Sequence, residues 1–323
     1  MMPAAYRQEA AVATATMILL AVMGVKAPDF FTPANLNDMF LASLPVLVVA
    51  LGMTLLIVTG EIDISVGSAF AVCSVAAGVC AKQAPLAGTA VAAIVACAAG
   101  GVLGALNGWL AAYIRVPSIV VTLAMMIALR DGLRWATQGA WVQDLPENFQ
   151  WLGFSQHSYA AAVAAVTAVL LAAFAWASRD ISGVRAMYAT GSNPAAARLA
   201  GIDTRRMKFI AFVCVGVLTG LAAVLNAARF NQIPPNTGIG LEMKVIAAVV
   251  IGGTSITGGR GTIFGTLLGV ILLAAIGPAL TFLGLSAYWE RAVQGAIILM
   301  AVAMDALSSR AEAYAIDVAP TRA

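Results

Sequence analysis

The sequence contains few charged residues and only one histidine. Asp, Glu, Lys and Arg make up 10% of its 323 residues, whereas a soluble globular domain carries about 25%. Water could not solvate a surface this poor in charge, so a soluble globular protein is excluded. The lone histidine, His157, excludes a His-rich metal site and histidine-based acid–base catalysis. The net charge of +3 is too small to indicate nucleic acid as a partner.

Sequence motifs of enzymes are missing as well. The chain holds neither G-x-S-x-G nor H-E-x-x-H. Segment 250–265 reads VIGGTSITGGRGTIFG, but Gly259 stands where a phosphate-binding loop needs Lys. We therefore expect no catalytic residue, no metal and no bound cofactor. The four cysteines all lie in apolar stretches, as is typical of buried free thiols: Cys73, Cys80, Cys97 and Cys214.

Hydrophobic residues dominate what is present. They make up 61% of the chain, and the mean hydropathy is +0.92. A helix needs about 20 apolar residues to cross the hydrocarbon core of a membrane. Stretches of that length without any Asp, Glu, Lys or Arg run from Lys82 to Arg115, from Glu147 to Arg179, from Lys208 to Arg229 and from Arg260 to Glu290. Because the runs are continuous and do not alternate, they favour helices over a membrane barrel.

The sequence therefore predicts an all-α, polytopic integral membrane helix bundle that occupies residues 1–323 as a single transmembrane domain. About ten transmembrane helices are expected, of which the third and eighth are short enough to be broken or half-crossing. The expected spans are 10–25, 39–59, 64–81, 86–114, 116–135, 158–178, 209–228, 243–256, 262–283 and 287–307.

Two long loops predict the orientation. Loop 179–208 carries six cations against two acids, which is typical of a cytoplasmic loop: Arg179, Arg185, Arg198, Arg205, Arg206 and Lys208. Loop 136–157 carries no Lys or Arg and is expected outside, with Trp151 and Phe154 as anchors at the membrane interface. With ten spans, both termini are then cytoplasmic.

Segment 58–68, VTGEIDISVGS, places two acids between apolar runs. An acid at the centre of a membrane helix costs roughly 2.5–3.5 kcal/mol, so Glu61 and Asp63 are not expected to face lipid. Two interpretations stay open. One is a tight cytoplasmic turn capped by Asp63 or Ser65. The other is a structured helix break beside a translocation path, with Gly67 at its far side.

Glycine patterns indicate close helix packing and an internal repeat. Segment 250–265 follows an aliphatic run and precedes a helix of small residues, as segment 58–68 does, so the chain is expected to contain two related halves. Small residues every fourth position let helix backbones approach closely in lipid. Such stripes are Gly100, Gly104 and Gly108, then Gly216 and Gly220, then Gly261, Gly265 and Gly269.

Four segments together carry a family resemblance. They are TLLIVTGEIDISVGS (54–68), NGWLAAYIRVPSIVVTLAMM (107–126), YATGSNPAAARLAGIDTRRMK (188–208) and GLEMKVIAAVVIGGTSITGGRGTIFGTLLG (240–269). In these segments the chain resembles the sugar-type permeases of bacterial ABC importers, the ribose, rhamnose and autoinducer-two group, which is distantly similar to the branched-chain amino-acid permeases. The outer segment WVQDLPENFQWLG and the later NTGIGLEMK look nearer to the rhamnose and autoinducer-two permeases than to the ribose ones.

The resemblance implies a mechanism and a set of partners. Two permease subunits, as a homodimer or with a paralogous permease, would form the pathway in the bacterial inner membrane and contact its lipid. Two separate ABC ATPase subunits would hydrolyse ATP, so this chain itself needs no cofactor. A periplasmic sugar-binding protein would deliver a monosaccharide or related sugar.

The resemblance also implies that residues 189–202 supply a short coupling helix that docks into a groove of the ATPase. The local residues suit such a helix, because Asn193 can cap it, Pro194 fits its first position and Gly201 can end it. Arg198 lies on the helix and is assigned to coupling with them. The simpler alternative is an amphipathic surface turn.

Polar residues within the apolar runs are candidates for the lining of a pathway: Asn107, Ser118, Thr122 and Asn226. The main alternative function is an ion-coupled secondary transporter or channel, which would need its own ion-coupling groups within the membrane. Besides the acids of segment 58–68, Glu242 and Asp305 are the candidate carboxylates for such a role. No residues cluster in a way that favours a membrane-embedded enzyme.

Overall fold

The computed structural model describes residues 4–83, 88–286, 288–297 and 299–300. In this part of the chain the regular structure is helical, apart from one isolated antiparallel bridge. The elements are α1 (Ala4–Lys26), η1 (Pro28–Phe31), α2 (Pro33–Val58), α3 (Val66–Gln83), α4 (Gly88–Gly108), η2 (Trp109–Tyr113), α5 (Ser118–Thr137), η3 (Gln150–Gly153), α6 (Gln156–Asp180), α7 (Ser182–Ser192), α8 (Pro194–Leu199), α9 (Thr204–Ala227), α10 (Leu241–Ile251) and α11 (Ile263–Phe282).

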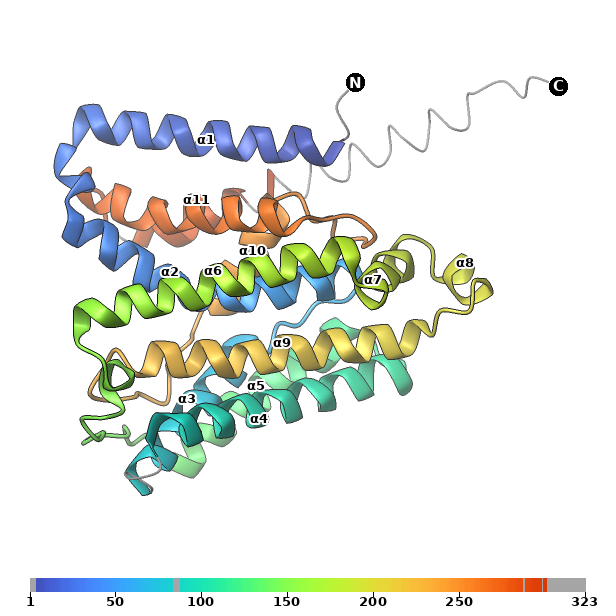
Figure 1. Ribbon diagram of the computed structural model, residues 1–323, viewed down its shortest axis with the longest axis horizontal. Helices are drawn as coiled ribbons and strands as arrows, with labels where there is room; N and C mark the ends of the chain where they lie inside the picture. Colours follow the sequence, from blue (N-terminus) through green and yellow to red (C-terminus); the bar gives the residue numbers. More distant parts are fainter. Residues whose placement is uncertain (1–3, 84–87, 287, 298, 301–323) are drawn as a thin grey trace.

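The long helices run along one axis of the molecule (Figure 1). Helices α7 and α8 lie at one end of this axis, and the loop between α5 and α6 lies at the other. Seven described helices are long and apolar enough to cross a membrane. They are Gln8–Lys26, Pro33–Val58, Val66–Gln83, Thr89–Tyr113, Ser158–Asp180, Thr204–Ala227 and Ile263–Phe282. The all-α polytopic membrane bundle predicted from the sequence is therefore confirmed.

The remaining expected spans differ from these seven. Helix α5 has 20 residues but carries Arg130, Asp131 and Arg134 in its C-terminal half. Helix α10 has 11 residues, about 16 Å at 1.5 Å per residue, which is roughly half the hydrocarbon thickness. The prediction that this helix reaches residue 256 was wrong, because Gly253 has φ +95 and the chain turns there. The last expected span, 287–307, lies partly outside the described residues.

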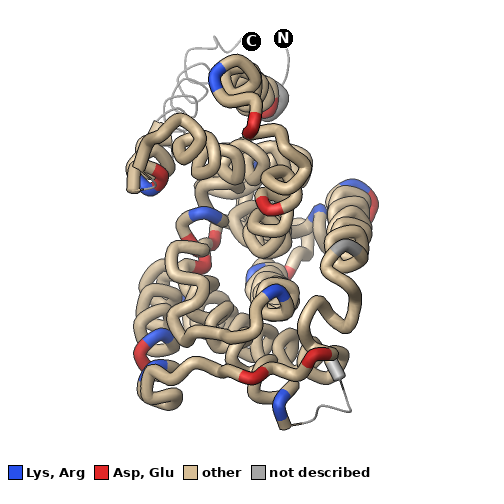
Figure 2. Tube along the Cα trace, turned by 90° about the vertical axis from the view of Figure 1, so that its left-hand side faces the viewer, with Lys and Arg blue, Asp and Glu red and all other residues tan. Residues whose placement is uncertain are grey.

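Helix α2 forms the centre of the bundle. Its apolar window is 83% buried, whereas that of α6 is 11% buried. The outer helices α1, α4 and α6 instead expose large apolar side chains, among them Val25, Val102 and Val169. A soluble protein does not leave apolar faces of this extent in water, so these faces are the surface that contacts lipid. Figure 2, seen from the end opposite α7 and α8, shows that most of the chain is uncharged.

Glycines of all three stripes pack helices against each other, as predicted, although Gly261 lies before the start of α11. A β-carbon added to Gly100 on α4 would fall 2.1 Å from the carbonyl oxygen of Gly216 on α9. A β-carbon added to Gly265 on α11 would fall 1.9 Å from the carbonyl oxygen of Gly252, just after α10. Both crossings bring backbone against backbone, which only glycine permits at this separation.

The loop between α5 and α6 is tied to the segment that follows α9. Val142 and Ile233 form the isolated bridge, with N···O distances of 3.0 and 2.9 Å. The ring of Trp151 packs edge-on against Tyr159 with centroids 5.2 Å apart. Trp151 therefore faces inward, and of the two aromatics expected at the membrane interface, Phe154 is the exposed one.

Candidate functional site

Helix α2 stops at Val58 and α3 starts at Val66, so the chain breaks where the sequence places its two acids. Gly60 in this break has φ +83, a left-handed conformation that favours glycine. Gly67 does not belong to the break, because it lies in the first turn of α3. Its small size is needed for packing, since a β-carbon there would fall 2.0 Å from Glu242 Oε2.

Asp63 holds the turn that leads into α3. Its Oδ1 accepts hydrogen bonds from Ser65 N at 2.8 Å and from Ser65 Oγ at 2.6 Å. Its Oδ2 accepts one from Asn107 Nδ2 at 3.2 Å, and the same amide nitrogen lies 2.9 Å from Ser65 Oγ. All three residues are buried. A carboxylate at this position also complements the positive end of the α3 dipole. Among the described residues, Asn107 Oδ1 finds no partner.

Glu61 points to the other side of the break and forms an ion pair with Lys208 near the start of α9. This pair joins the break to the helix that follows α8. Ser118 lies beside it at the start of α5, with its Oγ 3.5 Å from Ile62 N. The two acids of segment 58–68 therefore have separate roles, because Asp63 holds the turn before α3 and Glu61 pairs with a cation.

A second break separates α10 from α11 and lies against the first one. Gly259 N donates to Val58 O at 2.8 Å. Gly258 has φ +90, and a β-carbon there would fall 3.0 Å from both Gly60 N and Val58 O. Thr262 caps α11 by accepting from Gly265 N at 2.9 Å. The two segments that looked alike in the sequence are thus neighbours in space.

Helix α7 packs onto both breaks at once. A β-carbon added to Gly191 would fall 1.8 Å from Val58 O and 2.7 Å from Gly259 N. The hydroxyl of Tyr188 on the same helix donates to Gly261 O at 3.0 Å. Burial raises the pKa of this tyrosine, so its hydroxyl stays protonated and able to donate. Helix α7 is therefore in direct contact with both breaks.

Helix α8 follows α7 at the tip of the molecule (Figure 1). Asn193 Oδ1 accepts from Ala195 N at 3.1 Å and from Ala196 N at 3.0 Å, and Pro194 occupies the first position. Gly201 has φ +83, and its N–H donates to Arg198 O at 3.0 Å. The cap, the first position and the glycine end predicted from the sequence are confirmed. The role of these residues in coupling stays a prediction.

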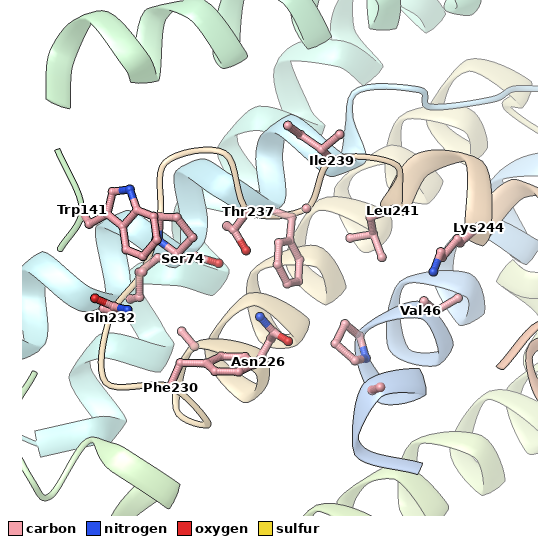
Figure 3. A pocket seen from close by; sticks show the side chains of 17 residues that line it. Val46, Ser74, Trp141, Asn226, Phe230, Gln232, Thr237, Ile239, Leu241 and Lys244 are labelled. Atoms are coloured by element: carbon pink, nitrogen blue, oxygen red, sulfur yellow. The ribbon is translucent and has the colours of Figure 1, made fainter. Parts of the chain in front are cut away.

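A cavity of about 500 Å³ lies toward the opposite end, near the loop between α5 and α6. Figure 3 shows Asn226 from α9, Thr237 from the following loop and Lys244 from α10 around it. The aromatic rings of Trp141 and Phe230 also line it. The cavity thus combines aromatic surface with amide, hydroxyl and ammonium groups. Ser74 lines it too, and its Oγ is buried without a partner among the described residues.

The four residues expected to line a pathway do not come together within one subunit. Asn226 lines the cavity of Figure 3. Ser118 lines a different pocket at the α8 end. Asn107 is engaged with Asp63, and the hydroxyl of Thr122 donates to Ser118 O at 2.9 Å, so both are used inside the bundle. Whether any of them contacts a substrate stays a prediction.

Sequence reasoning missed Trp141 and Lys244. Lys244 Nζ forms an ion pair with Glu290 Oε1 at 2.7 Å, and Gln294 Nε2 donates to the same oxygen at 2.9 Å. The signal was present, because Lys244 and Glu290 are charges at the edges of apolar runs. Their pairing was hidden, since 46 residues separate them.

Comparisons with known proteins bear on these features. Residues 35–302 match the family model described as branched-chain amino acid transport system, permease component. The ribose import permease protein RbsC of Escherichia coli strain K12 is 37% identical over 300 residues, which cover 90% of this chain and 91% of that protein. The autoinducer 2 import system permease protein LsrC of Yersinia pestis is 35% identical over 291 residues, which cover 90% of this chain and 82% of that protein.

The sequence identities of 37% and 35% are too similar to say which of these two permeases the chain resembles more. The expected greater similarity to the rhamnose and autoinducer-two permeases therefore stays a prediction. No solved structure matches the chain. In the described residues, no three His, Cys, Asp or Glu side chains gather as a metal site would require. The family match spans most of the chain, including both breaks, α7 and α8. The ATPase of such an ABC importer is a separate protein, and the permease is its membrane subunit. The chain therefore belongs to the family of permease components of the branched-chain amino acid transport system type.

Proposed function

We propose that this chain forms the pathway through which an ABC importer moves a monosaccharide or related sugar, of the ribose, rhamnose or autoinducer-two kind, across the bacterial inner membrane. A periplasmic binding protein delivers the sugar and two ATPase subunits drive its movement. The observation that carries the proposal is the direct contact of α7 with both helix breaks, through Gly191. This contact joins α7, which lies in the loop between α6 and α9, to the α2–α3 break and the α10–α11 break.

The cavity of Figure 3 suits a sugar. Its volume of about 500 Å³ is within the usual range of roughly 300–1,000 Å³ for small-molecule sites. Asn226 and Thr237 offer both donors and acceptors to sugar hydroxyls. Trp141 and Phe230 offer rings against which the apolar face of a sugar can pack. In this proposal the cavity receives sugar on the outer side.

Energy coupling begins at α8. Its exposed residues, including Arg198, dock into the ATPase, and Asn193 joins α8 directly to α7. Movement of α7 then shifts the break held by Asp63 and Ser65 against the break between α10 and α11. Glu61, through Lys208, ties the first break to α9. The breaks act as hinges near the cytoplasmic mouth of the pathway.

The proposed topology has ten crossing segments, with α5, α10 and the helical residues 288–297 adding to the seven long helices. Helices α7 and α8 then face the cytoplasm, and the loop between α5 and α6 faces the periplasm. The positions of these two loops at opposite ends support this orientation (Figure 1). Both termini are cytoplasmic, the chain is one permease domain, and two copies or two paralogous permeases complete the pathway.

Uptake of radiolabelled ribose by proteoliposomes tests the proposal. With the ATPase, the binding protein and ATP present, uptake is expected, and it should stop without ATP. Asn226→Ala should lower it roughly tenfold, because loss of a hydrogen-bonding amide costs on the order of 1–2 kcal/mol. The matched control is Asn231→Ala, which removes an amide that does not line the cavity. Uptake by the chain alone, driven by an ion gradient, would contradict the proposal.

One observation keeps the ion-coupled transporter or channel as the second candidate. Glu242 is buried, and its Oε2 has no hydrogen-bond partner among the described residues. Asp63, by contrast, is held by three hydrogen bonds. If the chain alone moved substrate with protons, Glu242→Gln should abolish that movement. Asp305 lies outside the described residues.

A further inference from the structure

A strongly basic pocket lies at the α8 end of the molecule, between η2, the start of α5, α8 and the start of α9. Its volume is about 570 Å³. Four cations line it, namely Arg115, Arg198, Arg205 and Lys208, together with one carboxylate, Glu61. The lining groups therefore carry a net charge of +3. We call this site the basic pocket.

The charge of the basic pocket is only partly compensated. Glu61 pairs with Lys208. Arg115, Arg198 and Arg205 form no ion pair with any residue in the described part of the chain. Three guanidinium groups from three separate segments thus face one space without a counter-charge. All three residues are exposed, so water screens their mutual repulsion, and an anion that enters the space is attracted by all three.

We propose that the basic pocket binds a phosphate group, presented either by the headgroup of an anionic lipid or by a soluble phosphate compound. Guanidinium groups bind phosphate oxygens through paired N–H donors, and a phosphate offers several acceptor oxygens to more than one arginine. Basic pockets between membrane helices on the cytoplasmic side are suited to anionic headgroups. The pocket lies beyond the apolar part of α9, at the level where headgroups lie when this helix spans a membrane.

The surroundings of the pocket suit a lipid as the source of the phosphate. Trp109, Tyr113 and Ile114 lie on or next to η2, close in sequence to Arg115, and all three are exposed. Aromatic and aliphatic side chains of this kind pack against acyl chains and glycerol at the membrane interface. A phosphate bound in the pocket links Arg198 of α8 to the ion pair of the α2–α3 break. It therefore stabilises one position of α8 relative to that break.

Thermal unfolding of the purified full chain in lipid nanodiscs tests the proposal. The first arm compares nanodiscs of phosphatidylcholine with nanodiscs that also contain phosphatidylglycerol. The second arm adds inorganic phosphate to phosphatidylcholine nanodiscs, against chloride at equal ionic strength. A ligand that binds the folded state raises the unfolding temperature, and we expect a rise of about 3 °C or more in at least one arm. A rise in the first arm alone identifies lipid, and a rise in the second identifies soluble phosphate.

Two double variants separate the pocket from general surface charge. Arg115→Gln with Arg205→Gln removes two pocket cations and should abolish the rise. Arg179→Gln with Arg185→Gln removes two exposed cations at the same end of the molecule and should keep it. Equal responses of the two variants, or no rise in either arm for the wild-type chain, overturn the proposal. A rise that appears only when the ATPase subunit is added assigns the pocket to that partner and also overturns it.

Discussion

The contact between α7 and the two breaks leads to a sharp prediction for Gly191→Ala. The added β-carbon would lie 1.8 Å from Val58 O and 2.7 Å from Gly259 N. Heavy atoms in ordinary contact are about 3.5–4.0 Å apart, so α7 must move away by roughly 2 Å. If α7 stays in place, the added methyl group instead displaces the hydrogen bond from Gly259 N to Val58 O. Overpacking of this kind costs on the order of 1–3 kcal/mol, and an unmet buried amide costs a similar amount.

Two measurements check this prediction. The unfolding temperature of the purified subunit in detergent should fall by several degrees, and ATP-driven uptake should fall further because α7 no longer contacts the breaks. The matched control is Gly183→Ala, also on α7, where a β-carbon meets nothing within 4 Å. Alanine there should stabilise the helix by up to about 1 kcal/mol. If Gly191→Ala behaved like Gly183→Ala in both measurements, the proposed contact between α7 and the breaks would be refuted.

Three further predictions concern the turn held by Asp63, the topology and the coupling helix. Asp63→Asn should be mild in an uptake assay, because Asn107 can turn its unpartnered Oδ1 toward the new amide. Asp63→Leu should be severe, because it leaves the buried donors of Ser65 and Asn107 without their acceptor. Equal loss in both variants would revive a proton-coupling role. Ala195→Cys should react only with reagents on the cytoplasmic side and Glu147→Cys only from outside, both positions being exposed. Gly201→Pro should abolish ATP-driven uptake while membrane insertion persists. Proline can neither adopt φ +83 nor donate the N–H that bonds to Arg198 O at the end of α8. Normal uptake by this variant would count against coupling through α8.

Local features of the fold could be predicted from the sequence. The cap of α8 follows from Asn193 and Pro194, because a capping side chain reaches only two or three residues along the chain. The long apolar helices follow from the uncharged runs. The break around Glu61 and Asp63 follows from the high cost of acids in lipid.

Contacts between distant segments could not be predicted. A glycine signals that close approach is permitted but does not say what approaches it, so nothing marked Gly191 as the neighbour of both breaks. The end of α10 was placed too late because the chain carries no charge between Ile251 and Arg260, so the lack of charge did not mark the turn at Gly253. The cavity of Figure 3 draws its lining from α2, α3, α9, α10 and two loops, and no local pattern records that assembly.

Two buried carboxylates in the described part of the chain, Asp63 and Glu9, differ in when they can meet their partners during synthesis. Asp63 finds Asn107 only 44 residues later. Glu9 on α1 is buried and accepts its hydrogen bond from Thr262, which lies 253 residues further on. At roughly 5–20 residues per second, the ribosome needs about 13–50 s to supply that partner. Helix α1 therefore enters the membrane first, but its docking onto α11 comes among the last steps of assembly.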